Sequence, residues 1–95
     1  MLIIPAINAD SFEEVQKKIK LIEPYFSWVH LDIADGTFTK NTLWHNLVEF
    51  AMIETELNLE VHLMIDKVEE KIDHWFNPSV KRIIFHLGGS RDPGF

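Results

Sequence analysis

The chain has 95 residues, of which 46% are hydrophobic and 25% charged, a composition typical of one soluble globular domain. Its net charge of −6 and the lack of a basic patch argue against a nucleic-acid partner. The absence of cysteine excludes disulfides and thiolate chemistry. The sequence shows neither a basic leader nor an apolar run of membrane-spanning length. We therefore expect a cytoplasmic protein with no membrane partner.

Four apolar runs rich in β-branched or aromatic residues predict strands, and three segments with helical spacing separate them. In chain order the predicted strands are Leu2–Ile7, Phe26–Ile33, Leu59–Ile65 and Val80–Leu87. Strands that alternate with helices predict right-handed crossovers and a parallel sheet. The expected order is therefore β-α-β-α-β-α-β.

The first predicted helix begins at Ser11, which together with Glu14 has the pattern of a capping box, and it ends at Pro24. The second is expected over about Asn46–Glu56. The third is expected to open with Asp66 and Glu69 as a cap-like pair and to end at Asn77-Pro78. Each segment carries an apolar stripe, which for the third comprises Val68, Ile72, Trp75 and Phe76.

The last three predicted strands each have one aliphatic face and one mixed face. The aliphatic side chains should pack against the helices, whereas the mixed face cannot be a dry core, because unpaired charges there would cost several kcal/mol each. Such a face is typical of the inner wall of a β/α barrel. We therefore expect an α/β fold of the β/α-barrel kind, as a single domain over residues 1–95. The mixed faces comprise Trp28, His30, Asp32, Glu60, His62, Met64, Arg82, Ile84 and His86.

Three motifs, "VHLDIADGTF", "LEVHLMI" and "IIFHLGG", occur in this order along the chain. At this spacing they resemble the ribulose-phosphate 3-epimerase family of (β/α)8 barrels. The resemblance covers essentially all 95 residues, but only the N-terminal half of such a barrel, so it implies that the fold is half of a TIM (β/α)8 barrel. It implies a divalent metal held by His30, Asp32 and His62, with Asp32 also acting as an acid/base. Zinc, manganese or iron suits such ligands, and no organic cofactor is expected.

The resemblance also assigns residues to a substrate pocket. Met64 matches a methionine that lines it, and His86 matches a histidine near the substrate. Ala6 stands where the family usually has a serine that touches the substrate. The second catalytic aspartate of the family lies on the seventh strand, and its phosphate-binding loops follow the seventh and eighth. These 95 residues contain none of those parts.

Several of these residues have a second interpretation. His30, Asp32 and His62 are either a metal site or the remnant of one, satisfied by hydrogen bonds. His86 is either a pocket group or a hydrogen-bonded residue at the end of its strand. Glu60 and Arg82 are expected to form a structural ion pair. Of the other motifs, Asp35-Gly36 is expected to shape a turn, Trp44 and Trp75 to pack in the interior, and His45 and His74 to face solvent.

Two functions follow from the sequence. The first is an epimerase-like half-barrel for a sugar phosphate, which moves a proton at the carbon beside the carbonyl of a ketose. Whether the chain alone is an enzyme stays open at this point, because the second acid is not among its residues. The alternative is a non-catalytic half-barrel that serves as a structural or interaction module. In both cases the open edges of four parallel strands predict self-association into a homodimer or higher oligomer.

Overall fold

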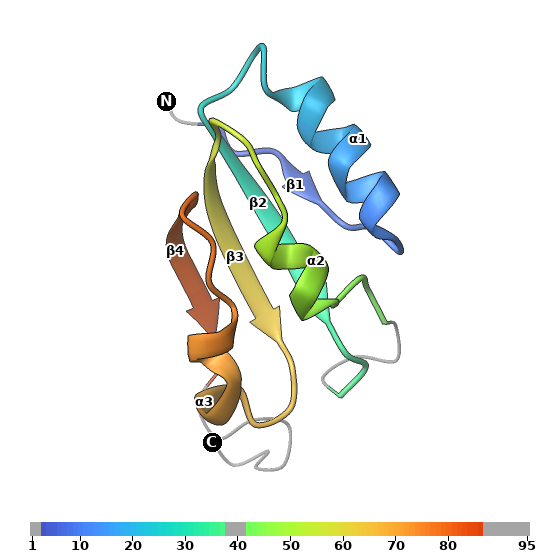
Figure 1. Ribbon diagram of the computed structural model, residues 1–95, viewed down its shortest axis with the longest axis vertical. Coiled ribbons are helices and arrows are strands. Elements are labelled where there is room, and N and C mark those ends of the chain that lie inside the picture. The colour runs from blue at the N-terminus through green and yellow to red at the C-terminus, as the bar shows by residue number, and fades with distance from the viewer. Residues whose placement is uncertain (1–2, 38–41, 87–95) are drawn as a thin grey trace.

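The computed structural model describes residues 3–37 and 42–86. Their four strands, β1 (Ala6–Ile7), β2 (Trp28–Ala34), β3 (Asn58–Met64) and β4 (Val80–Phe85), form one sheet in the order β1-β2-β3-β4. All three pairings are parallel, and helices alternate with the strands along the chain (Figure 1). The expected half of a TIM barrel is therefore confirmed.

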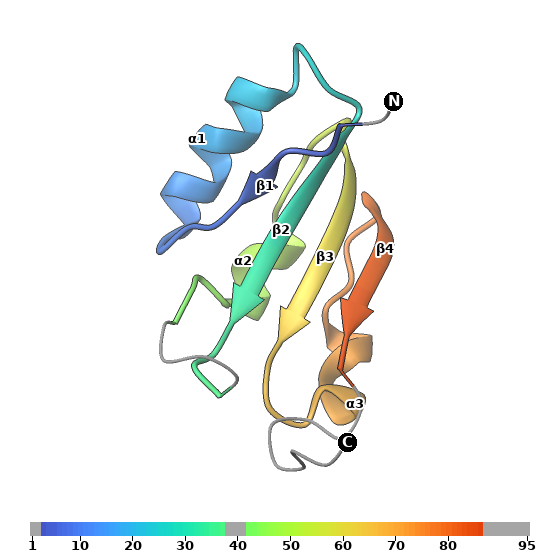
Figure 2. The same cartoon turned by 180° about the vertical axis from the view of Figure 1, so that it is seen from behind.

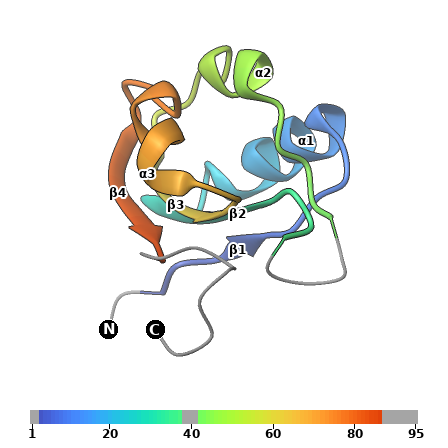
Figure 3. The ribbon, with the colours of Figure 1, turned by 90° about the horizontal axis from the view of Figure 1, so that it is seen from below.

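The helices cover one face of this sheet. Figures 1 and 3 show α1 (Phe12–Ile22), α2 (Leu47–Ala51) and α3 (Val68–Lys71) together on that side. The aliphatic side chains of the two central strands point into this layer and are at most 1% exposed, as the alternation predicts. They are Val29, Leu31, Ile33, Leu59, Val61 and Leu63.

The opposite face, here called the open face, is turned toward the viewer in Figure 2. None of the helices within the described residues covers it. It carries the mixed side chains predicted from the sequence, which are partly buried or exposed apart from Glu60. None of the helices in the described ranges is long and apolar enough to span a membrane.

The predicted strand bounds need small corrections. β1 is confined to Ala6–Ile7, because Pro5 has no N–H for the ladder, although its carbonyl accepts a hydrogen bond from the N–H of His30 at 2.8 Å. β2 begins at Trp28 rather than Phe26, whose N–H still bonds to the carbonyl of Ile22 at the end of α1. The predicted ends at residues 2 and 87 lie outside the described residues.

Helix α1 begins where its cap predicts. The hydroxyl of Ser11 accepts the N–H of Glu14 at 3.2 Å, as in a capping box. The carboxylate of Glu14 accepts the N–H of Asp10 at 2.9 Å rather than that of Ser11. The start of the helix is thus confirmed, with the reciprocal bond moved by one residue.

Helix α2 is much shorter than the predicted segment 46–56. It starts after Asn46, whose side chain accepts the N–H of Glu49, and it ends at Ala51. The buried side chain of Asn77 explains the early end. Its amide donates to the carbonyls of Phe50 at 3.0 Å and Ile53 at 2.9 Å. These carbonyls would otherwise accept bonds from a continuing helix.

The third helical segment also departs from its prediction. α3 has only four residues and continues as a 3₁₀ turn, Ile72–His74. Its cap is Lys67, in the left-handed conformation with φ 53°, and not Asp66. The tighter turn leaves Phe76 70% exposed instead of in the apolar stripe, while Trp75 is buried.

The aromatic core under α2 joins the helices to the sheet. Trp44 stacks on Phe12 with ring centroids 5.7 Å apart, and Phe50 meets the edge of Trp75 at 5.2 Å. Trp44 and Trp75 are both 6% exposed, so their predicted packing role is confirmed. His45 and His74 are exposed, also as predicted.

Candidate metal centre

The strand register places the polar side chains of the open face in two adjacent rows. In the first row, His30 of β2 pairs with Glu60 of β3, which pairs with Arg82 of β4. In the second row, Asp32 pairs with His62. Successive residues of a strand point to opposite faces, so all five side chains lie on the same side of the sheet.

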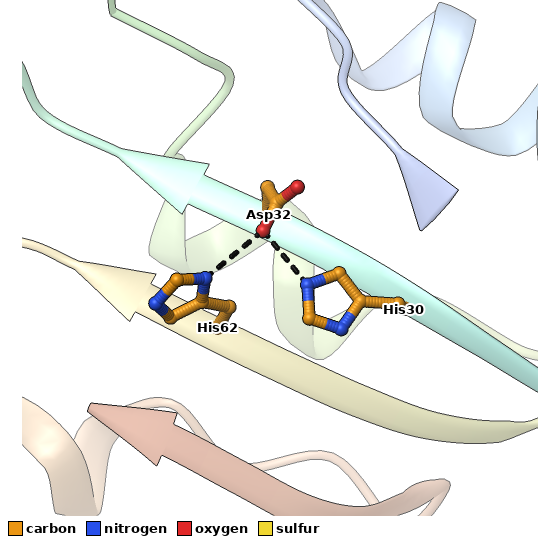
Figure 4. Close-up of side chains that lie close together, drawn as sticks. All are labelled: His30, Asp32 and His62. Atoms are coloured by element: carbon orange, nitrogen blue, oxygen red, sulfur yellow. Dashed lines mark hydrogen bonds and ion pairs between the residues drawn. The ribbon is translucent and has the colours of Figure 1, made fainter. Parts of the chain in front are cut away.

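Three of these side chains converge on one point (Figure 4). Oδ1 of Asp32 lies 2.8 Å from Nε2 of His30 and 3.2 Å from Nδ1 of His62. One ligand atom from each residue lies within 4.8 Å of the others. The side chains are 20%, 15% and 23% exposed for His30, Asp32 and His62, so solvent still reaches the group.

This donor set fits a divalent metal. Two imidazole nitrogens and one carboxylate oxygen are ligands that zinc, manganese and iron accept. Three protein ligands with access to solvent match the arrangement in which a fourth position is left for water or substrate. Within the described residues, Oδ2 of Asp32 accepts no hydrogen bond, so this oxygen is available to a ligand.

The predicted ion pair between Glu60 and Arg82 is confirmed, and it extends further than the sequence indicated. Oε2 of Glu60 accepts from Nη1 of Arg82 at 2.5 Å, while its Oε1 lies 2.6 Å from Nδ1 of His30. The guanidinium of Arg82 also lies over the ring of Trp28, 5.0 Å from the centroid. The ion pair is therefore joined directly to the candidate metal centre.

These contacts shift two protonation equilibria. Burial tends to lower the pKa of His30, but the hydrogen bonds to the Glu60 and Asp32 carboxylates outweigh it, and the pKa is raised. The pKa of Glu60 is lowered, chiefly by its hydrogen bond to His30 and also by Arg82, against the effect of burial. Glu60 is thus held as a carboxylate between two donors.

His86 follows β4 and contacts the second row. Its Nε2 lies 3.1 Å from Nε2 of His62, and the two ring centroids are 5.3 Å apart. His86 is thus hydrogen-bonded after the end of its strand, directly beside a candidate ligand. Its role in a substrate pocket stays a prediction.

The other two predicted pocket residues lie on the same face. Ala6 of β1 is exposed and pairs in register with His30. Met64 is partly buried at the end of β3 and pairs with Ala34. Their contact with a substrate stays a prediction.

Asp35 shapes the loop after β2, as predicted. Its Oδ1 accepts from the backbone N–H and the hydroxyl of Thr37, at 3.1 and 2.6 Å, around Gly36 with φ 93°. Its Oδ2 accepts the N–H of Asp66 at 2.9 Å, which ties this loop to the one after β3. Burial would raise the pKa of Asp35, but these hydrogen bonds outweigh it and the pKa is lowered.

The similarity of this chain to known proteins extends over nearly all of its residues. The model of the ribulose-phosphate 3 epimerase family matches residues 2–93. The chain belongs to this family. It is 27% identical over 88 residues to the chloroplastic ribulose-5-phosphate-3-epimerase of Arabidopsis thaliana, covering 90% of this chain and 31% of that protein.

Two bacterial members of the epimerase family give the same result. The ribulose-phosphate 3-epimerase of Synechocystis sp. is 27% identical over 95 residues, which is 98% of this chain and 41% of the relative. That of Chlamydia pneumoniae is 35% identical over 74 residues, 77% of this chain and 32% of the relative. The chain therefore spans between about a third and two fifths of the length of these relatives.

Proposed function

We propose that this chain binds a divalent metal through His30, Asp32 and His62 and supplies one acid/base, Asp32, for an epimerase reaction on a ketose phosphate. The observation that carries the proposal is the convergence of three ligand atoms within 4.8 Å in a chain of the ribulose-phosphate 3-epimerase family. The substrate class follows from the names of the relatives.

The chemistry would proceed at the carbon beside the carbonyl of the ketose. A bound metal would stabilise negative charge on the oxygens of the substrate. The Asp32 carboxylate takes the proton from that carbon, and the electron pair moves to the carbonyl oxygen to give an enediolate. A proton returned to the opposite face of the same carbon then inverts its configuration. Oδ2 of Asp32 would accept this proton, since Oδ1 already faces the two histidines.

Proton transfer on two faces of one carbon requires a second positioned acid. Within the described residues, the open face offers no other carboxylate beside the three ligands except Glu60, which is engaged by His30 and Arg82. We therefore expect the isolated 95-residue chain to bind metal but to show negligible turnover.

The test is a zinc titration of the isolated chain by calorimetry, with ribulose 5-phosphate turnover measured in parallel. Wild type should bind about one zinc per chain, and His62→Ala should lose this binding. His45→Ala, which changes an exposed histidine, is the matched control. Equal zinc binding by wild type and His62→Ala would show that the site does not exist.

A second function, self-association as an interaction module, is favoured by the open face. Parallel sheets are normally covered on both faces, whereas here the described helices cover only one. Two copies that pair β1 of one with β4 of the other, twice, would close eight strands into a barrel. Each copy would then contribute its Asp32 to a shared interior.

A cytoplasmic location stays a prediction, and one relative is named as chloroplastic.

A further inference from the structure

The first row of the open face is a continuous chain of contacts that ends on a candidate metal ligand. Trp28 lies against the guanidinium of Arg82, Arg82 donates to Oε2 of Glu60, and Oε1 of Glu60 lies 2.6 Å from Nδ1 of His30. Nε2 of the same ring, on its other side, faces Asp32. One nitrogen of His30 thus faces the candidate metal centre, and the other faces Glu60.

We propose that Glu60 is a positioning residue, which accepts the hydrogen of His30 Nδ1 and thereby orients the ring with Nε2 toward the metal. This inference rests on the proposed metal binding and adds to it a residue that does not itself bind the metal. A metal-bound histidine commonly donates its other N–H to a carboxylate, which fixes the ring and its tautomer. The 2.6 Å contact has the length of a strong, charge-assisted hydrogen bond.

Arg82 determines which side-chain atom of residue 60 faces His30. An arginine side chain only donates hydrogen bonds, so the atom of residue 60 that faces Arg82 must be an acceptor. Both oxygens of a carboxylate accept, and Glu60 can therefore serve Arg82 and His30 at the same time. A glutamine in its place offers only one oxygen. With that oxygen turned to Arg82, its NH2 group would face His30.

The consequence of Glu60→Gln for His30 is a reversal of its tautomer. Nδ1 would have to accept a hydrogen bond from the NH2 group of the introduced glutamine, and the ring hydrogen of neutral His30 would move to Nε2. That nitrogen is the one that must be unprotonated to bind a metal. Glu60→Gln, which preserves size and shape, should therefore weaken metal binding without removing any ligand.

A second substitution should reverse this effect. In the double variant Glu60→Gln with Arg82→Met, no donor holds the glutamine oxygen. The amide can then rotate, present its oxygen to His30 Nδ1 and restore the original tautomer. Arg82→Met alone leaves the carboxylate facing His30. Glu49→Gln is the matched control, because Glu49 accepts a hydrogen bond from Trp44 on the helix side of the sheet, away from the site.

The zinc dissociation constant is measured for each protein by competition with a chromogenic chelator. Glu60→Gln should bind zinc at least about tenfold more weakly than wild type, which is the usual effect of losing such a partner. The double variant should recover most of this loss, and Glu49→Gln should match wild type. Unchanged binding by Glu60→Gln would overturn the inference, as would a double variant no better than Glu60→Gln while Arg82→Met binds normally.

Nitrogen NMR of the zinc-loaded wild type tests the same inference without a variant. His30 should carry its hydrogen on Nδ1 and the zinc on Nε2. Zinc on Nδ1 of His30 would overturn the role of Glu60 even if Glu60→Gln fails to fold. Wild type that binds no zinc at all would contradict the proposed function. Wild type that binds zinc, with Glu60→Gln binding it equally well, would contradict only the role of Glu60.

Discussion

Nε2 of His62 and Nε2 of His86 lie 3.1 Å apart, so one ring donates a hydrogen and the other accepts it. Nδ1 of His62 faces Asp32. With a metal on Nδ1, the hydrogen of His62 would sit on Nε2, and His86 would accept it. His86 would then support His62 in the way that we propose for Glu60 and His30, but with an imidazole nitrogen as the acceptor instead of a carboxylate.

Replacing His86 with alanine should consequently weaken zinc binding only a few-fold, because a neutral hydrogen bond contributes about 1 kcal/mol. The zinc dissociation constant measured by chelator competition checks this. His74→Ala, at an exposed histidine, should leave the constant unchanged. A loss as complete as that of His62→Ala would instead make His86 a ligand.

The contact between His30 and Glu60 predicts a stability maximum in mildly acidic solution. The pKa of Glu60 is lowered from its ordinary 4.5, so its contribution is present above pH 4.5 and is lost as the pH falls through the lowered value. The pKa of His30 is raised from 6.5, so its contribution is complete below pH 6.5 and is lost as the pH rises through the raised value. The groups facing this pair are Asp32 and Arg82, with His62 beyond Asp32.

Urea denaturation of the metal-free chain across a pH series measures this profile. The free energy of unfolding should be highest between about pH 5 and 6.5 and should decline on both sides. His30→Gln should remove the decline on the alkaline side, and His74→Ala should retain it. An alkaline decline that is unchanged in His30→Gln would show that another group causes it.

The alternation of side chains was sufficient to predict the faces of the sheet, but it did not reveal the contact between Glu60 and His30. Alternation assigns Val29 and Leu31 to one face and His30 to the other, whatever strand lies beside them. Alternation does not determine the register, that is, which residues of two neighbouring strands lie side by side. The sequence nevertheless contained a signal for this contact. The predicted metal site requires Asp32 to lie beside His62, and the same parallel register then places His30 beside Glu60.

The helix ends could not be predicted because distant or unusual backbone contacts determine them. The pattern around Phe50 is compatible with a longer helix, and it is Asn77, far along the chain, that occupies its last carbonyls. Similarly, Lys67 adopts a left-handed conformation that is uncommon for a residue other than glycine. Sequence spacing therefore located each helix correctly but overestimated the lengths of the second and third.

Asn77→Asp should destabilise the chain by about 2–4 kcal/mol, because the carbonyls of Phe50 and Ile53 lose the amide donor of Asn77 and face a carboxylate instead. The carbonyl of Phe50 keeps the N–H of Ile53 at 3.2 Å. The variant keeps the acceptor oxygen for the N–H of Ser79, 2.8 Å away in the wild type. Urea denaturation measures the difference. Asn8→Asp adds the same charge at an exposed position and should change the stability by less than about 0.5 kcal/mol. Equal effects of the two substitutions would mean that Asn77 does not determine the end of α2.

The open face makes a final prediction about assembly. Ile84 lies on it in register with His62 and is 37% exposed. Among the strands of residues 3–37 and 42–86, β1 and β4 are the edges of the sheet and each pairs on one side. Burial of this face by a second copy would cover Ile84 and complete the hydrogen bonding of both edges. Light scattering at micromolar concentration should therefore report about twice the chain mass of 11.1 kDa.

A charge at the same position should prevent this assembly. Ile84→Glu would place a carboxylate in the buried interface, where an unpaired charge costs several kcal/mol, and should reduce the mass to that of one chain. Met52→Glu, at an exposed residue beside α2 on the helix side, should remain associated. A folded wild-type monomer that persists at all concentrations would exclude the dimer. A Met52→Glu variant that dissociates as readily as Ile84→Glu would place the interface on the helices rather than on the open face.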